Sequence, residues 1–315
     1  MRLPDRVKIL DVTARDGIEA LGRAVPVDPR VELVNRLSDA GLAAIEIGAF
    51  VNPKAIPAMA GSDEVSRKIG RRKGVEYVGL VPNLRGLNDA IACGVRHVEI
   101  FTAATESFCQ ANINCSIEES FARFAPVMEE ASKHGVIVRG MVSCVFGCPY
   151  EGDVAPETVA PLVSRLHKLG CAEVGLGDTI GVGTPRSVGR LVEACERAGV
   201  PVASLSAHFH NTCGMALANC YAAMEMGVGI LEGGTGGLGG CPNAPGASGN
   251  VATEELVYML DGMGIESGVD LKKVVNIAQW ITNELGTSMD SKIAAAMSNP
   301  GMTYFDKIGQ HKREG

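Results

Sequence analysis

Short apolar runs recur along the chain, and a glycine opens most of them. Seven such units cover residues 41–46, 74–79, 94–99, 135–138, 170–174, 199–203 and 227–231. Each glycine stands where a helix ends in the left-handed conformation, and each run is short and apolar enough for a buried parallel strand. One more apolar run, residues 7–12, precedes the first unit. The pattern therefore predicts eight strands that alternate with helices.

The segments between these runs have helical features. Apolar residues follow helical spacing over 29–40, Ser116 opens a capping box, and Thr184 with Pro185 provides an N-cap followed by proline at the first helical position. Eight strands alternating with helices predict an α/β fold, a (β/α)₈ TIM barrel. We expect a single domain over residues 1–315, with a C-terminal helical extension from about residue 250.

A doubly wound open sheet is the alternative fold, and it requires a glycine-rich phosphate fingerprint early in the chain. The only G-x-G-x-x-G match is Gly234, Gly236 and Gly239, which follows the eighth run and precedes Cys241 and Pro242 instead of a helix. The chain also lacks a P-loop motif. The barrel is therefore the better prediction.

Two histidines follow the seventh apolar run, which we expect to form a strand at 200–203. Side chains alternate faces along a strand, so His208 and His210 point the same way and Phe209 points the other way. Paired imidazoles are suitable metal ligands, but a single buried or surface histidine is more often structural. The spacing alone leaves both interpretations open.

Functional side chains gather after the other predicted strands, where a barrel carries its active site. Asp16 follows the first strand and Asn250 follows the eighth, so together with the histidine pair they form a predicted set of oxygen and nitrogen ligands. This donor set favours Mg²⁺ or Mn²⁺, with Co²⁺, Fe²⁺ and Zn²⁺ as alternatives. Asp16 as a loop cap remains the structural alternative.

Arg15 adjoins Asp16, and a fixed guanidinium beside a metal site stabilises negative charge that develops on an oxygen. This pairing is typical of carbon–carbon bond cleavage or formation next to a thioester. Cys241 lies in a glycine-rich loop, where a thiol can carry a proton as the loop closes. A salt bridge for Arg15 and a small buried apolar role for Cys241 are the structural alternatives.

Composition restricts the partners. The 315 residues are 46% hydrophobic and 4% aromatic and carry a net charge of −7 without a long basic run, so we expect no nucleic-acid partner. We expect no membrane partner either, because no apolar stretch approaches membrane-spanning length. Ten scattered cysteines without a C-x-x-C pair and no signal peptide predict free thiols and a cytoplasmic location.

The chain resembles the 3-hydroxy-3-methylglutaryl-CoA lyase family of metal-dependent TIM-barrel lyases from about Val7 to its C-terminal helices. The resemblance rests on five motifs, which are RDG at 15–17, NINCSIEESF at 112–121, GCPYEG at 147–152, LGDTIGVGTP at 176–185 and GLGGCPNAPGASGN at 237–250. It implies an acyl-CoA substrate and a homodimer or larger homo-oligomer.

The resemblance also implies roles for individual residues. The metal ligands would be Asp16, His208, His210 and Asn250. Arg15 would stabilise the enolate of the departing acetyl-CoA, and Cys241 would take part in proton transfer. The expected catalytic group is Arg15, Glu46, Asp178, His208 and Cys241, and the expected substrate contacts are Arg15, Glu19 and Thr179.

Several positions depart from the family pattern. Glu19 replaces the usual glutamine, Ala49 a serine and Asn243 a tyrosine, while residues 55–58 read AIPA instead of WVPQ. A glutamate near an anionic substrate adds a like charge, which weakens binding unless a cation offsets it. We therefore predict cleavage of hydroxymethylglutaryl-CoA to acetyl-CoA and acetoacetate. Citramalyl-CoA cleavage, a Claisen condensation and a non-catalytic acyl-CoA sensor are the alternatives.

Overall fold

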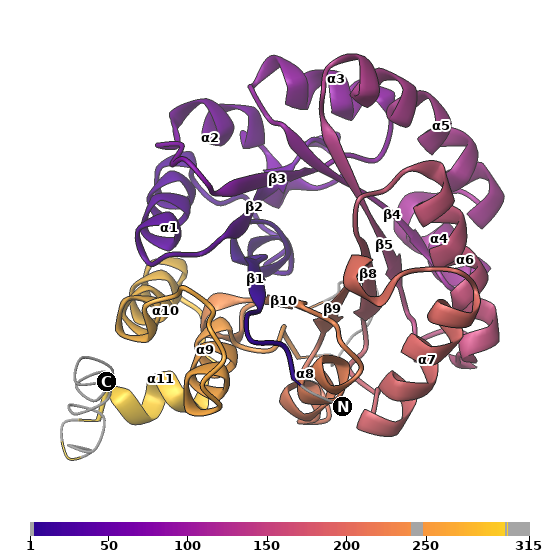
Figure 1. Cartoon of the computed structure of the whole chain (residues 1–315). Coiled ribbons are helices and arrows are strands. Elements are labelled where there is room, and N and C mark those ends of the chain that lie inside the picture. Colours follow the sequence, from indigo (N-terminus) through magenta and orange to yellow (C-terminus); the bar gives the residue numbers. More distant parts are fainter. Residues whose placement is uncertain (1–2, 241–247, 300, 302–315) are drawn as a thin grey trace.

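The computed structural model describes residues 3–240, 248–299 and 301, and its centre is a closed barrel of eight parallel strands (Figure 1). Around the barrel the strand order is β1-β10-β9-β8-β5-β4-β3-β2. The strands are β1 (Lys8–Asp11), β2 (Ala44–Ala49), β3 (Glu76–Leu80), β4 (His97–Ala103), β5 (Ile137–Ser143), β8 (Val174–Asp178), β9 (Leu205–Phe209) and β10 (Ile230–Gly233). The predicted (β/α)₈ barrel is confirmed. A two-stranded hairpin, β6 (Gly147–Cys148) with β7 (Gly152–Asp153), follows β5.

Strand β1 closes the barrel. It pairs in parallel with β10 on one side, where Ile9 lies opposite Leu231, and with β2 on the other, where Leu10 lies opposite Ala44. Closure satisfies the backbone groups that an open sheet would expose at its edges. It also brings residues from the two ends of the chain together at the carboxyl ends of the strands.

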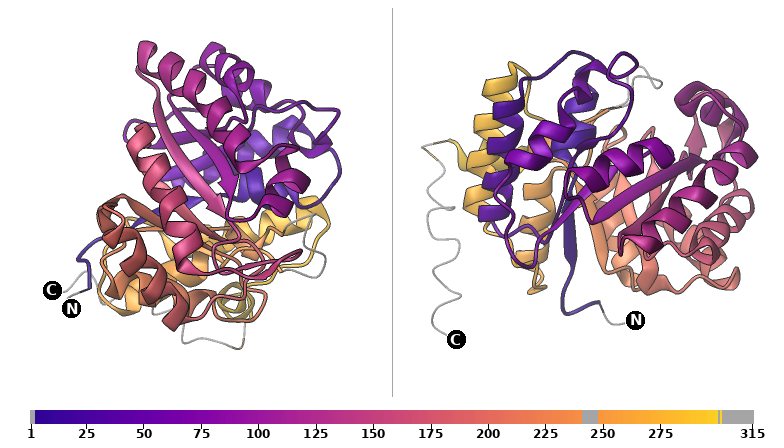
Figure 2. Two further views of the ribbon diagram at one scale, coloured as in Figure 1. Left: turned by 90° about the vertical axis from the view of Figure 1, so that its right-hand side faces the viewer. Right: turned by 90° about the horizontal axis from the view of Figure 1, so that it is seen from above.

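Helices surround the barrel (Figure 2). They are α1 (Val27–Asp39), α2 (Ser62–Lys68), α3 (Leu84–Ala92), α4 (Glu106–Ile113), α5 (Ile117–Lys133), α6 (Pro156–Leu169), α7 (Pro185–Arg197), α8 (Ala216–Glu225), α9 (Thr253–Gly262), α10 (Leu271–Leu285) and α11 (Lys292–Met297). The predicted caps at Ser116 and Thr184 are present. Helix α10 lies against α1, so the end of the described chain packs beside its beginning (Figures 1 and 2).

The seven glycines of the sequence pattern adopt the predicted conformation. Their φ angles lie between 62° and 106°, for Gly41, Gly74, Gly94, Gly135, Gly170, Gly199 and Gly227. A side chain would strain the backbone at such angles, which explains why glycine recurs at this point of each unit.

The predicted position of the seventh strand was wrong. Residues Val202–Ser204 form a 3₁₀ turn, and the strand begins only at Leu205. Pro201 lacks the backbone N–H that a strand between two neighbours must donate, so the apolar run around it does not pair. His208 therefore lies inside the strand, and His210 follows directly after its end.

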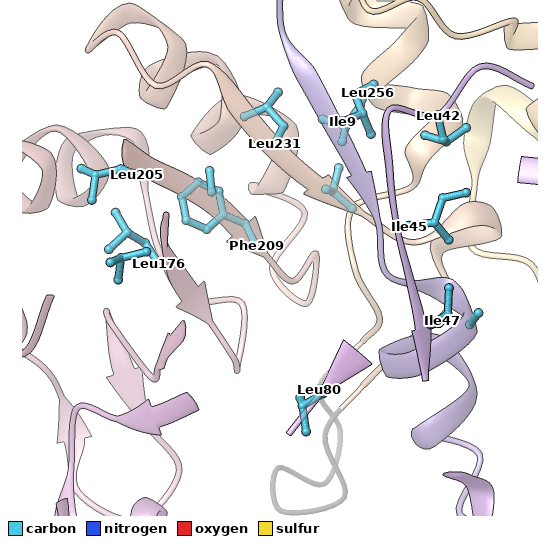
Figure 3. Close-up of a cluster of buried hydrophobic side chains, with 14 of the residues drawn as sticks. Ile9, Leu42, Ile45, Ile47, Leu80, Leu176, Leu205, Phe209, Leu231 and Leu256 are labelled. Carbon is cyan, nitrogen blue, oxygen red and sulfur yellow. The ribbon is translucent and has the colours of Figure 1, made fainter. Parts of the chain in front are cut away.

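Apolar side chains on the outer face of the barrel pack beneath the helices. Figure 3 shows Ile9, Leu205, Phe209 and Leu231 on their strands, with Leu256 of α9 close to Ile9. Most of the buried apolar residues belong to this single continuous cluster. It fixes the strands whose ends carry the site.

The inner face differs, because it combines a small apolar cluster with buried charges. Leu10, Val12, Ala44 and Val78 form that cluster. Lys8 lies two positions before Leu10, and Glu76 lies two positions before Val78, so both share the inner face of their strands. Nζ of Lys8 donates to Oε2 of Glu76 at 3.1 Å. The barrel interior is therefore charged as well as apolar.

Candidate active site at the carboxyl ends of the strands

A cavity of about 110 Å³ lies at the carboxyl ends of the strands, and its lining includes two contrasting groups of side chains. We call the first group the polar wall, which consists of Arg15, Asp16, Glu19, Thr179, His208 and His210. We call the second group the apolar wall, which consists of Val51, Ile56, Leu80, Phe101, Phe108 and Met141. The polar wall collects most of the site residues expected from the sequence, whereas the apolar wall was not predicted.

The polar wall begins directly after β1, where Thr13–Gly17 form a single π-helical turn. Such wide turns are frequent at functional sites. The Nε atom of Arg15 donates to Oε2 of Glu46 at 2.8 Å, and its Nη1 donates to Oδ1 of Asp16, also at 2.8 Å. The guanidinium is therefore held in a fixed direction by two carboxylates.

The histidine pair faces Asp16, as the period of a strand predicts. The Nε2 atoms of His208 and His210 are 3.3 Å apart, and Nε2 of His210 is 3.9 Å from Oδ2 of Asp16. One potential ligand atom from each of the three residues lies within 4.8 Å of the other two. The structure therefore brings together three of the four predicted ligands in one cluster.

Asn250 completes this arrangement from the other end of the chain. Its Nδ2 donates to Oδ2 of Asp16 at 2.7 Å and to the carbonyl of Leu238 at 3.0 Å, while its backbone bridges to that of His210. Its buried Oδ1 has no hydrogen-bond partner among the described residues. A buried acceptor without a partner, on a residue that is bonded to Asp16 and bridged to His210, fits a divalent cation.

Electrostatics at the cluster also suit a cation. Burial lowers the pKa of His210 to about 4, so its imidazole is neutral and offers a lone pair. Burial alone would raise the pKa of Asp16, but opposing effects, above all the charge of the neighbouring Arg15, outweigh burial and lower it. A neutral imidazole beside an anionic carboxylate is the form in which both residues bind metal.

Glu46 lies behind Arg15 and is fully buried. One of its oxygens accepts the bond from Arg15, and burial raises its pKa to about 8 even though Arg15 opposes the shift. Glu46 therefore supports the guanidinium from inside the barrel, while the cavity itself is lined by Arg15.

Asp178 is the last residue of β8 and Thr179 follows it, but the two side chains face different ways. The Asp178 carboxylate accepts the backbone N–H groups of Val182 at 3.1 Å and Gly183 at 2.8 Å, which caps the turn after the strand. Thr179 lines the cavity, and its Oγ1 accepts the backbone N–H of Cys144 at 2.9 Å. Of these two predicted residues, the structure brings only Thr179 to the cavity lining.

Glu19 lies in the polar wall as expected. Burial raises the pKa of its carboxyl, and the neighbouring Arg15 acts in the opposite direction. Ile56, from the segment that departs from the family pattern, lines the apolar wall. Cys241 and Asn243 lie outside the described residues, so their predicted roles are not tested.

The glycine-rich segment after β10 approaches the cluster very closely. Gly239 has a φ of 141°, and a Cβ at this position would lie 2.3 Å from Nδ2 of Asn250 and 3.0 Å from Oδ2 of Asp16. The start of the segment is tied down by Glu254, whose two oxygens each accept the backbone N–H of Gly236 at 3.1 Å. Only a residue without a side chain fits here.

A buried chain of charges behind the cluster was also missed by sequence reasoning. Nδ1 of His208 lies 3.2 Å from Oε2 of Glu232, and Glu232 in turn pairs with Arg139. Nη1 of Arg139 donates to Glu99 at 2.6 Å. The available signal was a charged residue inside a strand that is otherwise mostly apolar, as with Glu99, Arg139 and Glu232. Such a charge needs a buried partner when its side chain points into the barrel.

None of the helices in the described part of the chain is long and apolar enough to cross a membrane.

Comparisons with known proteins place the chain among lyases. The family model described as HMGL-like matches residues 6–281. The hydroxymethylglutaryl-CoA lyase of Pseudomonas mevalonii is 49% identical over 292 residues, which cover 93% of this chain and 97% of that protein. The 3-hydroxy-3-isohexenylglutaryl-CoA/hydroxy-methylglutaryl-CoA lyase of Pseudomonas aeruginosa is 48% identical over 297 residues, or 94% of this chain and 99% of that protein.

Structural comparison leads to the same family. The crystal structure of hydroxymethylglutaryl-CoA lyase from P. aeruginosa matches with a TM-score of 0.91 at 48% identity, covering 94% of this chain and 99% of that one. The similarity extends over the barrel strands that carry the polar wall as well as the surrounding helices.

Proposed function

Because the chain belongs to the HMGL-like family, we propose that it cleaves 3-hydroxy-3-methylglutaryl-CoA to acetyl-CoA and acetoacetate. The observation that carries this proposal is the convergence of Asp16, His208 and His210 beside a fixed Arg15 in one cavity. Carbon–carbon cleavage next to a thioester needs a cation to polarise oxygen and a guanidinium to receive the developing charge.

The cation would be held by Asp16, His208, His210 and Asn250. When bound, a divalent metal ion supplies Lewis-acid polarisation of a substrate hydroxyl or carbonyl oxygen. Mg²⁺ or Mn²⁺ remains our prediction for the metal, since the donor set mixes carboxylate, amide and imidazole. The fit rests on the short distances within the cluster and on the unpartnered Oδ1 of Asn250.

In the reaction, a base takes the proton of the tertiary hydroxyl group on C3. The oxygen electron pair forms the ketone of acetoacetate, the C2–C3 bond breaks, and its electrons move onto the thioester as an enolate. A proton delivered to C2 completes acetyl-CoA. Arg15 is positioned to stabilise the enolate oxygen, because Glu46 and Asp16 hold its guanidinium at the cavity.

Other groups have narrower roles in this proposal. Thr179 and Glu19 line the cavity and would contact the acyl group, whereas the buried Glu46 would support Arg15. Asp178 would shape the turn after β8. Proton transfer by Cys241, a part for His208 in proton transfer, a cytoplasmic location and a homodimer or larger assembly remain predictions.

A broader substrate range is a second candidate. Six apolar side chains line the cavity, and a relative 48% identical to this chain is named for 3-hydroxy-3-isohexenylglutaryl-CoA as well as the methyl compound. An apolar wall accommodates the alkyl branch on C3 and gains free energy as that branch lengthens. The chain would then act on 3-hydroxy-3-alkylglutaryl thioesters of more than one size.

The test is product analysis by mass spectrometry with the purified protein and Mg²⁺ or Mn²⁺. 3-Hydroxy-3-methylglutaryl-CoA, 3-hydroxy-3-isohexenylglutaryl-CoA and citramalyl-CoA are supplied separately, and we expect equal amounts of acetyl-CoA and acetoacetate from the first. Arg15→Gln should abolish turnover while the exposed Arg186→Gln keeps it. If only citramalyl-CoA is cleaved, giving pyruvate and acetyl-CoA, then citramalyl-CoA is the substrate in place of the proposed one. If none of the three thioesters is cleaved although metal is bound, the protein is better explained as an acyl-CoA sensor.

A further inference from the structure

Glu232 has no role in the reaction as described above, although it touches a predicted metal ligand. We propose that Glu232 is a positioning residue that fixes the ring and the tautomer of His208 for a divalent cation, and that Arg139 and Ser206 hold Glu232 in place. This inference rests on the metal-dependent function proposed above. It concerns residues that the sequence did not single out.

The strand register places the two side chains together. In the parallel pair β9–β10, Glu232 lies directly opposite His208, so both point into the barrel. Oε2 of Glu232 is 3.2 Å from Nδ1 of His208, and the other ring nitrogen, Nε2, faces His210. A carboxylate beside Nδ1 requires that nitrogen to carry the proton, which leaves the Nε2 lone pair directed at the cluster.

Glu232 is itself immobilised through its second oxygen. Oε1 accepts the hydroxyl of Ser206 at 2.6 Å and also accepts a bond from Arg139. Nη2 of Arg139 donates to the same Ser206 hydroxyl at 2.8 Å. Both carboxylate oxygens are therefore occupied, and the direction of the Glu232 carboxylate is set by two different strands.

Charge pairing with Arg139 does not by itself account for Glu232. Arg139 already has Glu99 at 2.6 Å from Nη1 and Glu173 at 3.6 Å from Nε. Glu173 is only partly buried and also pairs with Lys8, whereas Glu232 is fully buried, and a second fully buried carboxylate beside one guanidinium is costly in free energy unless it has a further partner. That partner is His208, which gives Glu232 a function that Glu99 and Glu173 do not share.

The experiment measures Mn²⁺ affinity directly, by electron paramagnetic resonance of free Mn²⁺, without any substrate. Glu232→Gln should weaken Mn²⁺ binding about 10- to 100-fold, the range observed when partners behind a metal ligand are lost. Glu173→Gln is the matched control, because it also removes a carboxylate from Arg139 without touching His208. We expect Glu173→Gln to bind Mn²⁺ like the unaltered protein.

A spectroscopic measurement separates positioning from a purely structural role. Nitrogen-15 spectra of histidine-labelled protein, with six histidines to assign, report which ring nitrogen carries the proton. With neutral rings, His208 should be protonated at Nδ1 in the unaltered protein and in Glu173→Gln. In Glu232→Gln it should become a mixture of the two tautomers.

Unchanged Mn²⁺ affinity and an unchanged His208 tautomer in folded Glu232→Gln would overturn the inference. If that variant does not fold, Ser206→Ala decides, because it removes only one hydrogen bond to Glu232 and should weaken Mn²⁺ binding roughly threefold. No change in Ser206→Ala would then count against the inference. A failure of lyase activity in the unaltered protein would refute the proposed function but leave these Mn²⁺ measurements interpretable.

Discussion

The polar and apolar walls of the cavity are built in different ways. The polar wall takes its ligands from β9, from the residue directly after it and from the turn after β1, and these side chains are fixed by hydrogen bonds and ion pairs. Half of the apolar wall also comes from strands, through Leu80, Phe101 and Met141, but the other half, Val51, Ile56 and Phe108, comes from segments that follow the strands. Strand ends suit chemistry that needs exact placement, whereas connecting segments tolerate replacement.

Two departures from the family pattern reach the cavity, one on each wall. Residues 55–58 contribute Ile56 to the apolar wall, while Arg15, Asp16 and both histidines match the family on the polar wall. Glu19 lies on the polar wall and changes its charge. We therefore expect changes to the polar wall to remove turnover and changes to the apolar wall to redirect it.

The largest effect is expected when a predicted ligand is removed. His210→Ala should lower kcat at least about 1000-fold, because Lewis-acid stabilisation of the transition state contributes several kcal/mol. It should also abolish the rise in melting temperature that Mn²⁺ gives the unaltered protein. His134→Ala, on the exposed end of α5, should change neither kcat nor this rise. Turnover retained in folded His210→Ala would remove the metal cluster from the mechanism.

The next largest effect comes from backbone packing behind the polar wall. Gly239→Ala places a Cβ 2.3 Å from Nδ2 of Asn250, so the asparagine or the glycine-rich segment must move. We expect kcat/KM to fall about 100-fold, because small displacements of catalytic groups have effects of this size. Gly214→Ala shares a positive φ but has open space around it, so only modest destabilisation is expected. Equal kinetics in the two variants would show that the contact is unimportant.

A smaller, pH-dependent effect should come from Glu19. Burial raises the pKa of Glu19, so the side chain gains its negative charge only as the pH rises through that elevated value. The charged form repels a substrate carboxylate, and KM of the unaltered protein should therefore increase several-fold with pH. Glu19→Gln should flatten this dependence, whereas Glu157→Gln on the surface should not. A parallel rise in KM for both variants would assign the dependence to another group.

The smallest effect on the methyl substrate is expected in the apolar wall. Ile56→Ala enlarges the space for the branch on C3, so kcat/KM for 3-hydroxy-3-isohexenylglutaryl-CoA should rise about tenfold relative to 3-hydroxy-3-methylglutaryl-CoA. Ile137→Ala, at the partly exposed start of β5, is the control and should leave this ratio unchanged. The ratio is measured by competition between the two thioesters. An unchanged ratio in Ile56→Ala would show that Ile56 does not help to recognise the branch on C3.

Local patterns explain why the barrel and the ligand cluster were predictable. Each glycine with its following run is one unit of the barrel, and the two-residue period of a strand alone places His208 and His210 on one face. Asp16 followed from the rule that barrel sites lie after strands. The seventh strand was misplaced because apolar character outweighed the missing N–H of Pro201.

Long-range partners explain what the sequence could not provide. Arg139 bonds to Glu99 and Glu232, which are 40 and 93 residues away, and nothing local indicates these pairs. The apolar wall depends on which residue of a run points inward, as for Phe101 beside the buried Ile100. That choice follows from the strand register and not from the degree of hydrophobicity.

Closure of the barrel through β1 determines when the active site can assemble during synthesis of the chain. The side chains of Asp16 and Asn250 are hydrogen-bonded across 234 positions of sequence, and the two histidines come from the seventh barrel strand and the position directly after it. While the chain is being synthesised, a fragment that ends before β9 carries only one of the four predicted ligands. The four-ligand site can therefore form only after nearly the whole barrel has been synthesised. Binding of a cation during folding would then indicate that the barrel has closed.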